Sequence, residues 1–288
     1  MRFASLPASL AMSLLFVTLA EGFTPDRCDK GTVDWNPIAS AEAMSGFCGI
    51  LAGFVFAAVV MVIGEKNPTG GDGHASRGLR LLLPSFFGLA VAAYLYALTA
   101  GELVCRRALT EQLFAGAILA ADAIVVILSL AWLLLAYQRN QHGEVRFFRG
   151  LILVTALFSL SMLTVSSVGF HNAVLERKAA GWADAMVWTS GIAFMAVVWR
   201  CWRRPTPLPP PGAPPNWQNE VFLNKRVTVS SWTTLLVGGV LAAASAAAVG
   251  IPYDSWDMPT WLVYTMSEAA LVIPATIIAS GMLAVPRE

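Results

Sequence analysis

Two acidic side chains inside long apolar runs are the residues of this chain best suited to do chemistry. Asp122 lies about ten residues into one run, roughly 15 Å along a helix, and Glu268 about eight residues into another, roughly 12 Å along it. A charge at the centre of a membrane helix costs about 3 kcal/mol or more, so such acids usually face the interior, pair with a base or stay protonated. Both acids are candidates for binding a proton or a cation. The alternative is a neutral acid that only forms hydrogen bonds with its neighbours.

Further polar residues gather toward one end of the apolar runs. Glu42, Glu102 and Asp184 lie near the ends of three runs, and His171 follows a fourth. If these helix faces converge, they form an outward-opening polar cavity with acids at its mouth and deeper inside. The predicted substrate- or ion-binding residues are Asp122, Glu268, Glu102, Glu42 and His171.

The stretch LTAGELVCRRALTEQ, residues 98–112, separates two of these runs. It contains Glu102 with Arg106, and Arg107 with Glu111, each at the i, i+4 spacing of ion pairs on a helix surface. Such exposed pairs stabilise a helix by about 0.2–0.5 kcal/mol each. The stretch is therefore predicted to be a turn on the outer side, and ion pairs on a helix surface explain most of its charged residues.

Composition indicates what these residues are embedded in. Hydrophobic residues make up 57% of the chain and charged residues 13%, with a mean hydropathy of +0.64, whereas soluble domains have about 25% charged residues. The apolar segments run over about residues 3–20, 40–64, 80–101, 112–137, 150–170, 183–200, 231–250 and 259–284. They lack the alternating pattern of barrel strands, so the predicted fold is all-α: a polytopic membrane helix bundle in a lipid bilayer. A net charge of +1 gives no reason to expect a nucleic-acid partner.

The first segment differs from the other seven. Its apolar core, LAMSLLFVTLA, is short and ends in the small-residue pattern Thr18-Leu19-Ala20. Residues 1–20 are therefore predicted to be either a signal peptide or an additional first helix. Residues 21–288 are predicted to form a single membrane domain with seven transmembrane helices.

Basic residues predict the orientation. With the N-terminus inside, thirteen Lys and Arg residues fall on the inner side and six on the outer side, as the positive-inside rule favours. The C-terminus is then cytoplasmic. The alanine-rich multi-pass pattern suggests a bacterial inner membrane and is too common to indicate a function.

The cysteines follow from this topology. Cys28 and Cys105 both fall on the outer, oxidising side, so a disulfide between them is allowed, and two free thiols are the alternative. No pair has the C-x-x-C spacing of a metal or redox site. No metal site is predicted.

Small residues and prolines suggest how the helices pack and connect. Gly49 and Gly53 form a G-x-x-x-G pattern, and Gly238 and Gly239 precede an alanine run, so both segments are predicted to pack closely, within the chain or against a second copy. The inner loop at 201–229 is proline-rich and is predicted to be an extended spacer. Its P-x-x-P pattern also fits a groove-binding motif, although a proline run meets that pattern readily by chance.

Several functions lack their signature residues. All four lysines fall outside the predicted spans, which argues against covalent retinal, and the three histidines are dispersed away from helix centres, which argues against paired haem ligation. No G-x-S-x-G or H-E-x-x-H is present. The sequence therefore indicates no cofactor and no enzyme class.

Two hypotheses remain. The first is a small transporter, channel or proton- or cation-coupled component that uses buried acids in an outward-facing polar cavity. The second is a non-catalytic assembly or scaffold subunit that packs against other membrane proteins or a copy of itself.

Overall fold

The computed structural model describes residue 28 and residues 36–64, 72–137, 142–175, 181–203, 217–249 and 258–283. The predicted signal peptide or first helix, residues 1–20, lies outside the described residues. The prolines of the predicted spacer, within 205–215, lie outside them as well.

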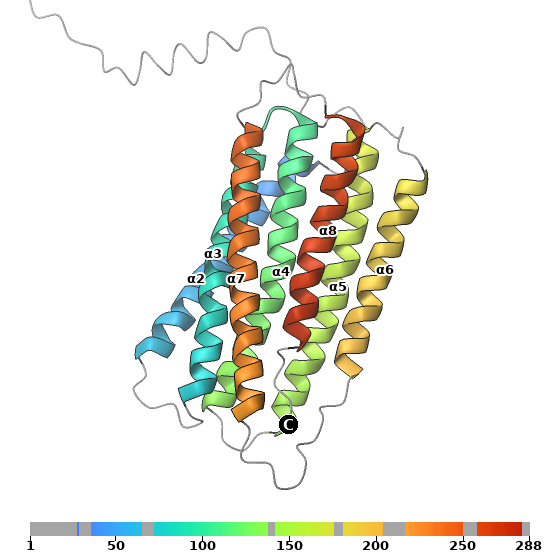
Figure 1. Ribbon diagram of the computed structural model, residues 1–288. Coiled ribbons are helices and arrows are strands. Elements are labelled where there is room, and N and C mark those ends of the chain that lie inside the picture. The colour runs from blue at the N-terminus through green and yellow to red at the C-terminus, as the bar shows by residue number, and fades with distance from the viewer. Residues whose placement is uncertain are drawn as a thin grey trace, which may run out of the picture.

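Seven long helices form a bundle (Figure 1). Each contains a stretch long and apolar enough to cross a membrane, and the described residues include no strand. The predicted all-α bundle with seven apolar helices is confirmed. The helices are α2 (Pro37–Gly64), α3 (Asp72–Ala100), α4 (Cys105–Tyr137), α5 (His142–Val174), α6 (Gly181–Arg203), α7 (Trp217–Val249) and α8 (Thr260–Leu283).

The helices extend beyond the apolar segments that predicted them. α7 begins at Trp217, so the predicted loop at 201–229 is too long at its C-terminal end, and α6 includes residues up to Arg203. Hydropathy marks only what lies in hydrocarbon, whereas residues 217–230 contain neither proline nor glycine and continue the helix beyond that layer. Lys225, predicted to lie in the loop, belongs to α7, and its side chain is exposed.

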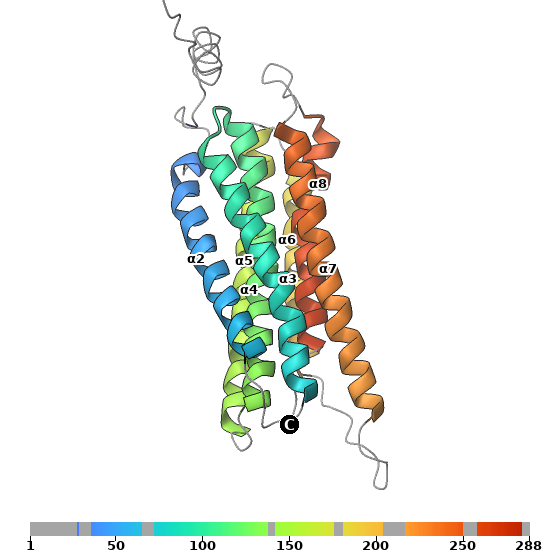
Figure 2. The ribbon, with the colours of Figure 1, turned by 90° about the vertical axis from the view of Figure 1, so that its left-hand side faces the viewer.

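α4 lies at the centre of the bundle, where it contacts α2, α3, α5, α7 and α8. Among the described helices, α6 contacts only α5 and α8 and forms one edge, while α2 contacts only α3 and α4 and forms the opposite edge (Figures 1 and 2). Helices α2, α4, α6 and α8 begin at the same end of the bundle, which we call the disulfide end. Several faces of α4 are therefore covered by neighbouring helices.

Large apolar side chains cover the outside of the bundle. Phe54, Phe158, Ile192 and Leu236, from four different helices, are each at least 60% exposed. A continuous apolar exterior of this kind is unstable in water and suits a lipid environment. The exterior agrees with a multi-pass membrane protein.

A proline in α3 creates a specific contact with α7. Pro84 has no N–H, so the carbonyl of Arg80, four residues earlier, lacks its usual helical donor. The hydroxyl of Ser231 on α7 lies 2.8 Å from that carbonyl oxygen and 2.9 Å from the carbonyl oxygen of Val227 in its own helix, so the two acceptors share its one hydrogen. The carbonyl group of Arg80, which Pro84 leaves without a helical donor, thereby takes part in a hydrogen bond between two helices.

The glycines that pack closely are mostly not those predicted. Gly49 and Gly53 lie on the exposed face of α2, where a Cβ would have no atom of the described residues within 4 Å, so their predicted packing within the chain is wrong. Gly238 contacts Phe87 of α3, whereas Gly239 is exposed. The G-x-x-x-G spacing identifies a smooth helix face but not which neighbour covers it.

Candidate functional site

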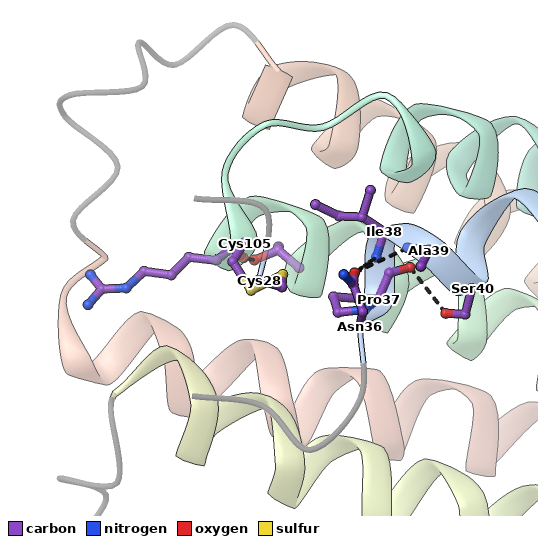
Figure 3. The surroundings of a disulfide bond; sticks show 9 residues. Cys28, Asn36, Pro37, Ile38, Ala39, Ser40 and Cys105 are labelled. Carbon is purple, nitrogen blue, oxygen red and sulfur yellow. Dashed lines mark hydrogen bonds between the residues drawn. A yellow bond between two sulfur atoms is a disulfide. The ribbon is translucent and has the colours of Figure 1, made fainter. Parts of the chain in front are cut away.

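A disulfide joins Cys28 to Cys105, the first residue of α4 (Figure 3). Their Cα atoms are 4.9 Å apart, and 77 positions separate them in the sequence. Close by, Asn36 caps α2: its side-chain oxygen accepts hydrogen bonds from the backbone N–H groups of Ile38 and Ala39. The disulfide ties the segment before α2 to the start of the central helix.

On both sides of Cys105 in the chain, two acids and one arginine are buried together. Nε of Arg107 lies 2.9 Å from Oε1 of Glu102 and 3.9 Å from Oε1 of Glu111. All three side chains are at most 7% exposed. The predicted i, i+4 pair of Arg107 with Glu111 is present, but it lies in the interior rather than on the surface. We call Glu102, Arg107 and Glu111 the carboxyl–arginine cluster.

The cluster contains one more acid than base. Arg107 can neutralise one carboxylate, and a second unpaired charge in a buried site has a high free-energy cost. Burial raises the pKa of Glu102, and the positive charge of Arg107 offsets that effect only in part. The carboxyls of Glu102 and Glu111 are also close enough for their charges to repel each other. The arrangement favours one proton shared between the two acids.

Asp122 lies deeper in the same helix and is fully buried. Neither carboxyl oxygen has a hydrogen-bond partner among the described residues. The carboxyl presses on α3 at Gly88, where a Cβ would lie only 2.6 Å from Cγ of Asp122. Only glycine leaves room for this acid, and the absence of polar partners favours the neutral form in a lipid environment.

Arg107, Glu111 and Asp122 lie on one face of α4. At about 100° per residue, positions 107, 111 and 122 fall within a sector of about 60°. This face is turned to α3, because Asp122 meets Gly88 there and Arg107 pairs with Glu102 at the turn between the two helices. The ionisable residues therefore form a line along the α3–α4 interface.

Two further ionisable groups lie along this line. The hydroxyl of Tyr96 on α3 lies beside Gly116 of α4, 3.7 Å from the position a Cβ would take there. The buried thiol of Cys48 on α2 is close enough to both Asp122 and Tyr96 for their charges to interact. Gly116 is about 8 Å along α4 from Glu111 and about 9 Å from Asp122. We call this series of groups the α3–α4 path.

Glu268 and Glu42 lie apart from this path. Oε1 of Glu268 is buried without a hydrogen-bond partner among the described residues, but α8 does not contact α2 or α3. Glu42 is on the exposed face of α2. Asp122 faces α3, so the described residues do not bring it together with Glu268 in a single cavity.

His171 is at the centre of a second polar cluster, near the disulfide end. It is fully buried on α5, with Nε2 2.5 Å from Oδ1 of Asp184 on α6 and Nδ1 3.3 Å from Oγ of Ser267 on α8. The side-chain amide of Asn172 donates to the same Asp184 oxygen at 3.0 Å. Three helices thus meet at one imidazole ring.

Ser267, His171 and Asp184 include the residue types of a hydrolase triad, but their arrangement does not suit one. A nucleophilic serine gives its proton to the histidine and must be reached by a substrate. Here the hydroxyl of Ser267 donates to the carbonyl oxygen of Ser167 at 2.9 Å, and Ser267 is fully buried. The cluster joins helices and presents no accessible nucleophile.

Sequence reasoning singled out Asp122, Glu102 and His171 but missed their partners. The sequence does contain a signal for Arg107 and Glu111: they precede Asp122 by fifteen and eleven residues, which places all three on one face of a helix. Ser267 carried no such signal, because only the packing of α8 on α5 brings it to His171.

Comparison of the chain with protein-family models, curated proteins and solved structures gives no match. The fold and the apolar exterior define a multi-pass helical membrane protein.

Proposed function

We propose that this protein is a small proton-coupled transporter, channel or component of such a system, and that protons move along the α3–α4 path. The observation that carries the proposal is the environment of Asp122: a fully buried acid without a hydrogen-bond partner in the described residues. An orphaned buried polar group costs about 1–3 kcal/mol. An apolar side chain would leave no polar group unsatisfied, so the acid is better explained by its ability to exchange a proton.

The carboxyl–arginine cluster is the entrance of this path in the proposal. It lies at the disulfide end, which we assign to the outer face because a disulfide persists on the oxidising side of a membrane. Its surplus acid provides a proton-binding group next to the surface. Tyr96 and Cys48 lie between it and Asp122, and each gap of about 8–9 Å along α4 requires bridging water.

The proton is favoured over a metal cation as the coupling ion. Hard cations such as Ca²⁺ and Mg²⁺ require about six oxygen ligands. Asp122 faces a glycine and a thiol, and the described residues contain no group of three His, Cys, Asp or Glu side chains arranged to hold a metal ion. A proton needs only the one carboxyl.

Proton flux in sealed proteoliposomes tests the proposal. A potassium diffusion potential drives proton entry, and an internal pH dye reports it. Asp122→Asn and Glu111→Gln should each lower the rate about tenfold or more, because an amide cannot carry the proton. Glu42→Gln, which changes an exposed carboxyl, is the matched control and should retain the wild-type rate. Absence of flux in wild type, or full flux in Asp122→Asn, would contradict the proposal.

A second candidate function is supported by α2. Glu42, Gly49 and Gly53 share its outward face, and no other helix of the described bundle covers the two glycines. Small residues on a lipid-facing surface favour association of membrane helices, as an assembly subunit requires. If this face binds a partner or a second copy, Gly49→Leu with Gly53→Leu should abolish its co-purification. A protein that remains monomeric and retains no partner would count against the assembly role.

A further inference from the structure

His171 makes two hydrogen bonds whose proton requirements can be counted. Ser267 has one hydroxyl hydrogen, which it donates to the carbonyl oxygen of Ser167 at 2.9 Å, a shorter contact than its 3.3 Å to His171. Ser267 can therefore only accept from Nδ1 of His171, so this nitrogen carries a hydrogen. The hydrogen bond at Nε2 then sets how many protons His171 and Asp184 hold together.

Nε2 of His171 faces a carboxyl oxygen 2.5 Å away. An ionised Asp184 can only accept, and a protonated Asp184 can only donate to an unprotonated Nε2. In both cases the pair holds one proton more than a neutral histidine beside an ionised aspartate. The donor from Asn172 to the same oxygen favours the ionised carboxylate, and hence an imidazolium ring.

We infer that His171 and Asp184 form a proton-binding site at the disulfide end, separate from the α3–α4 path and beyond the function proposed for that path. His171 itself is fully buried, but the side chain of Asp184 is 37% exposed, so a proton can enter from the aqueous side through the carboxylate. When the proton leaves by the same route, Nε2 is left without a hydrogen against the ionised carboxylate, while Nδ1–H still donates to Ser267. The ion pair and the hydrogen bond between His171 and Asp184 are then both lost.

The bound proton fastens α6 to the bundle. α6 contacts only α5 and α8, and the contact between Asp184 and His171 is its charged link at the disulfide end. At the opposite end, the guanidinium of Arg149 on α5 donates to the carbonyl oxygen of Trp202 and lies 5.5 Å from the centre of its ring. That second link contains no group that titrates near neutral pH. Release of the proton therefore loosens one end of α6 only.

The other ionisable groups around His171 do not replace this link. Tyr264 of α8 contacts the ring edge to face, with centroids 5.8 Å apart. α4 also packs on α5, and its charged residues at this end, Arg107 and Glu111, form the carboxyl–arginine cluster. On α8, Glu268 follows Ser267, but its buried Oε1 has no hydrogen-bond partner among the described residues. Asp184 is thus the carboxylate in contact with His171.

Nitrogen NMR of the full-length protein in lipid nanodiscs, with ¹⁵N-labelled histidine rings, tests the inference. His171→Gln identifies the resonance of His171 among those of the three histidines. We expect both ring nitrogens of His171 to be protonated at low pH and one proton to leave as the pH rises. Backbone hydrogen exchange in the first turns of α6 should accelerate with the same midpoint.

Asp184→Asn removes the opposing charge and keeps the shape of the side chain. The ring should then hold only one proton under conditions in which the wild-type ring holds two. Glu111→Gln, which tests the α3–α4 path, should leave the protonation of the ring unchanged, so the two proposals can fail independently. A His171 ring that never carries two protons, or exchange in α6 that ignores the titration, would overturn the inference. Hydrogen exchange in α6 is measured on the wild type, so that readout remains decisive if a variant fails to fold.

Discussion

Glu102 illustrates how one residue changes meaning between sequence and structure. From its spacing it was half of a surface pair with Arg106, whereas the structure buries it against Arg107 and Glu111. An i, i+4 spacing specifies which residues are neighbours along a helix but not whether another helix covers them. Burial raises the pKa of Glu102, so this carboxyl becomes ionised only at a higher pH than an exposed glutamate.

The raised pKa of Glu102 predicts a pH dependence of stability. The folded state holds this proton to a higher pH than the unfolded state, whose ordinary value is 4.5. The contribution to the free energy of unfolding is complete below that value and is lost as the pH rises through the folded-state pKa. Glu102→Gln should therefore flatten the decline of thermal stability in detergent as the pH rises above 4.5.

Glu42→Gln is the control for this experiment, since Glu42 is exposed. Its stability profile should run parallel to that of wild type. If Glu102→Gln also runs parallel, burial does not control the titration of Glu102.

At the scale of elements, polar contacts specify which helices meet. The link between Ser231 and the carbonyl freed by Pro84 joins α3 to α7, and His171 joins α5 to α6 and α8. In lipid the hydrophobic effect does not select helix partners, so interhelical hydrogen bonds and close contacts at glycines have more weight than in water. Sequence hydropathy locates the helices but does not predict which helices contact one another.

Ser231→Ala tests the link at Pro84. The variant should lower the free energy of unfolding by about 1 kcal/mol, because the carbonyl of Arg80 loses its donor. In a Pro84→Ala background, the restored N–H can satisfy that carbonyl, and the same substitution should cost less. Chemical or thermal unfolding in detergent measures both values.

Thr233→Ala provides a matched control. The hydroxyl of Thr233 bonds only within its own helix, to the carbonyl of Val229, and is exposed there. A loss of stability as large in Thr233→Ala as in Ser231→Ala would show that the contact between helices is not responsible.

At the scale of the whole molecule, the disulfide connects the segment before α2 to the central helix. Closing a loop between positions 77 residues apart restricts the unfolded chain strongly. Reduction, or Cys28→Ser, should lower stability by about 2–4 kcal/mol. Thermal unfolding with and without reductant measures this effect.

The remaining cysteines serve as the control for the reductant. Cys48 and Cys201 are free thiols, so Cys201→Ala should remain as sensitive to reductant as wild type, while Cys28→Ser should be insensitive. Equal stability of the oxidised and reduced wild type would contradict a stabilising role.

The sequence alone determined the class of fold, because long uncharged apolar runs in lipid have no stable alternative to helices. It also identified Asp122 and His171, whose polarity is conspicuous in or beside such runs. Only the tertiary structure decided that Asp122 faces α3 rather than Glu268, that Glu102, Arg107 and Glu111 are buried together, and that Ser267 meets His171. These features depend on the rotation and pairing of helices distant in the chain, which close packing sets and which hydropathy does not encode.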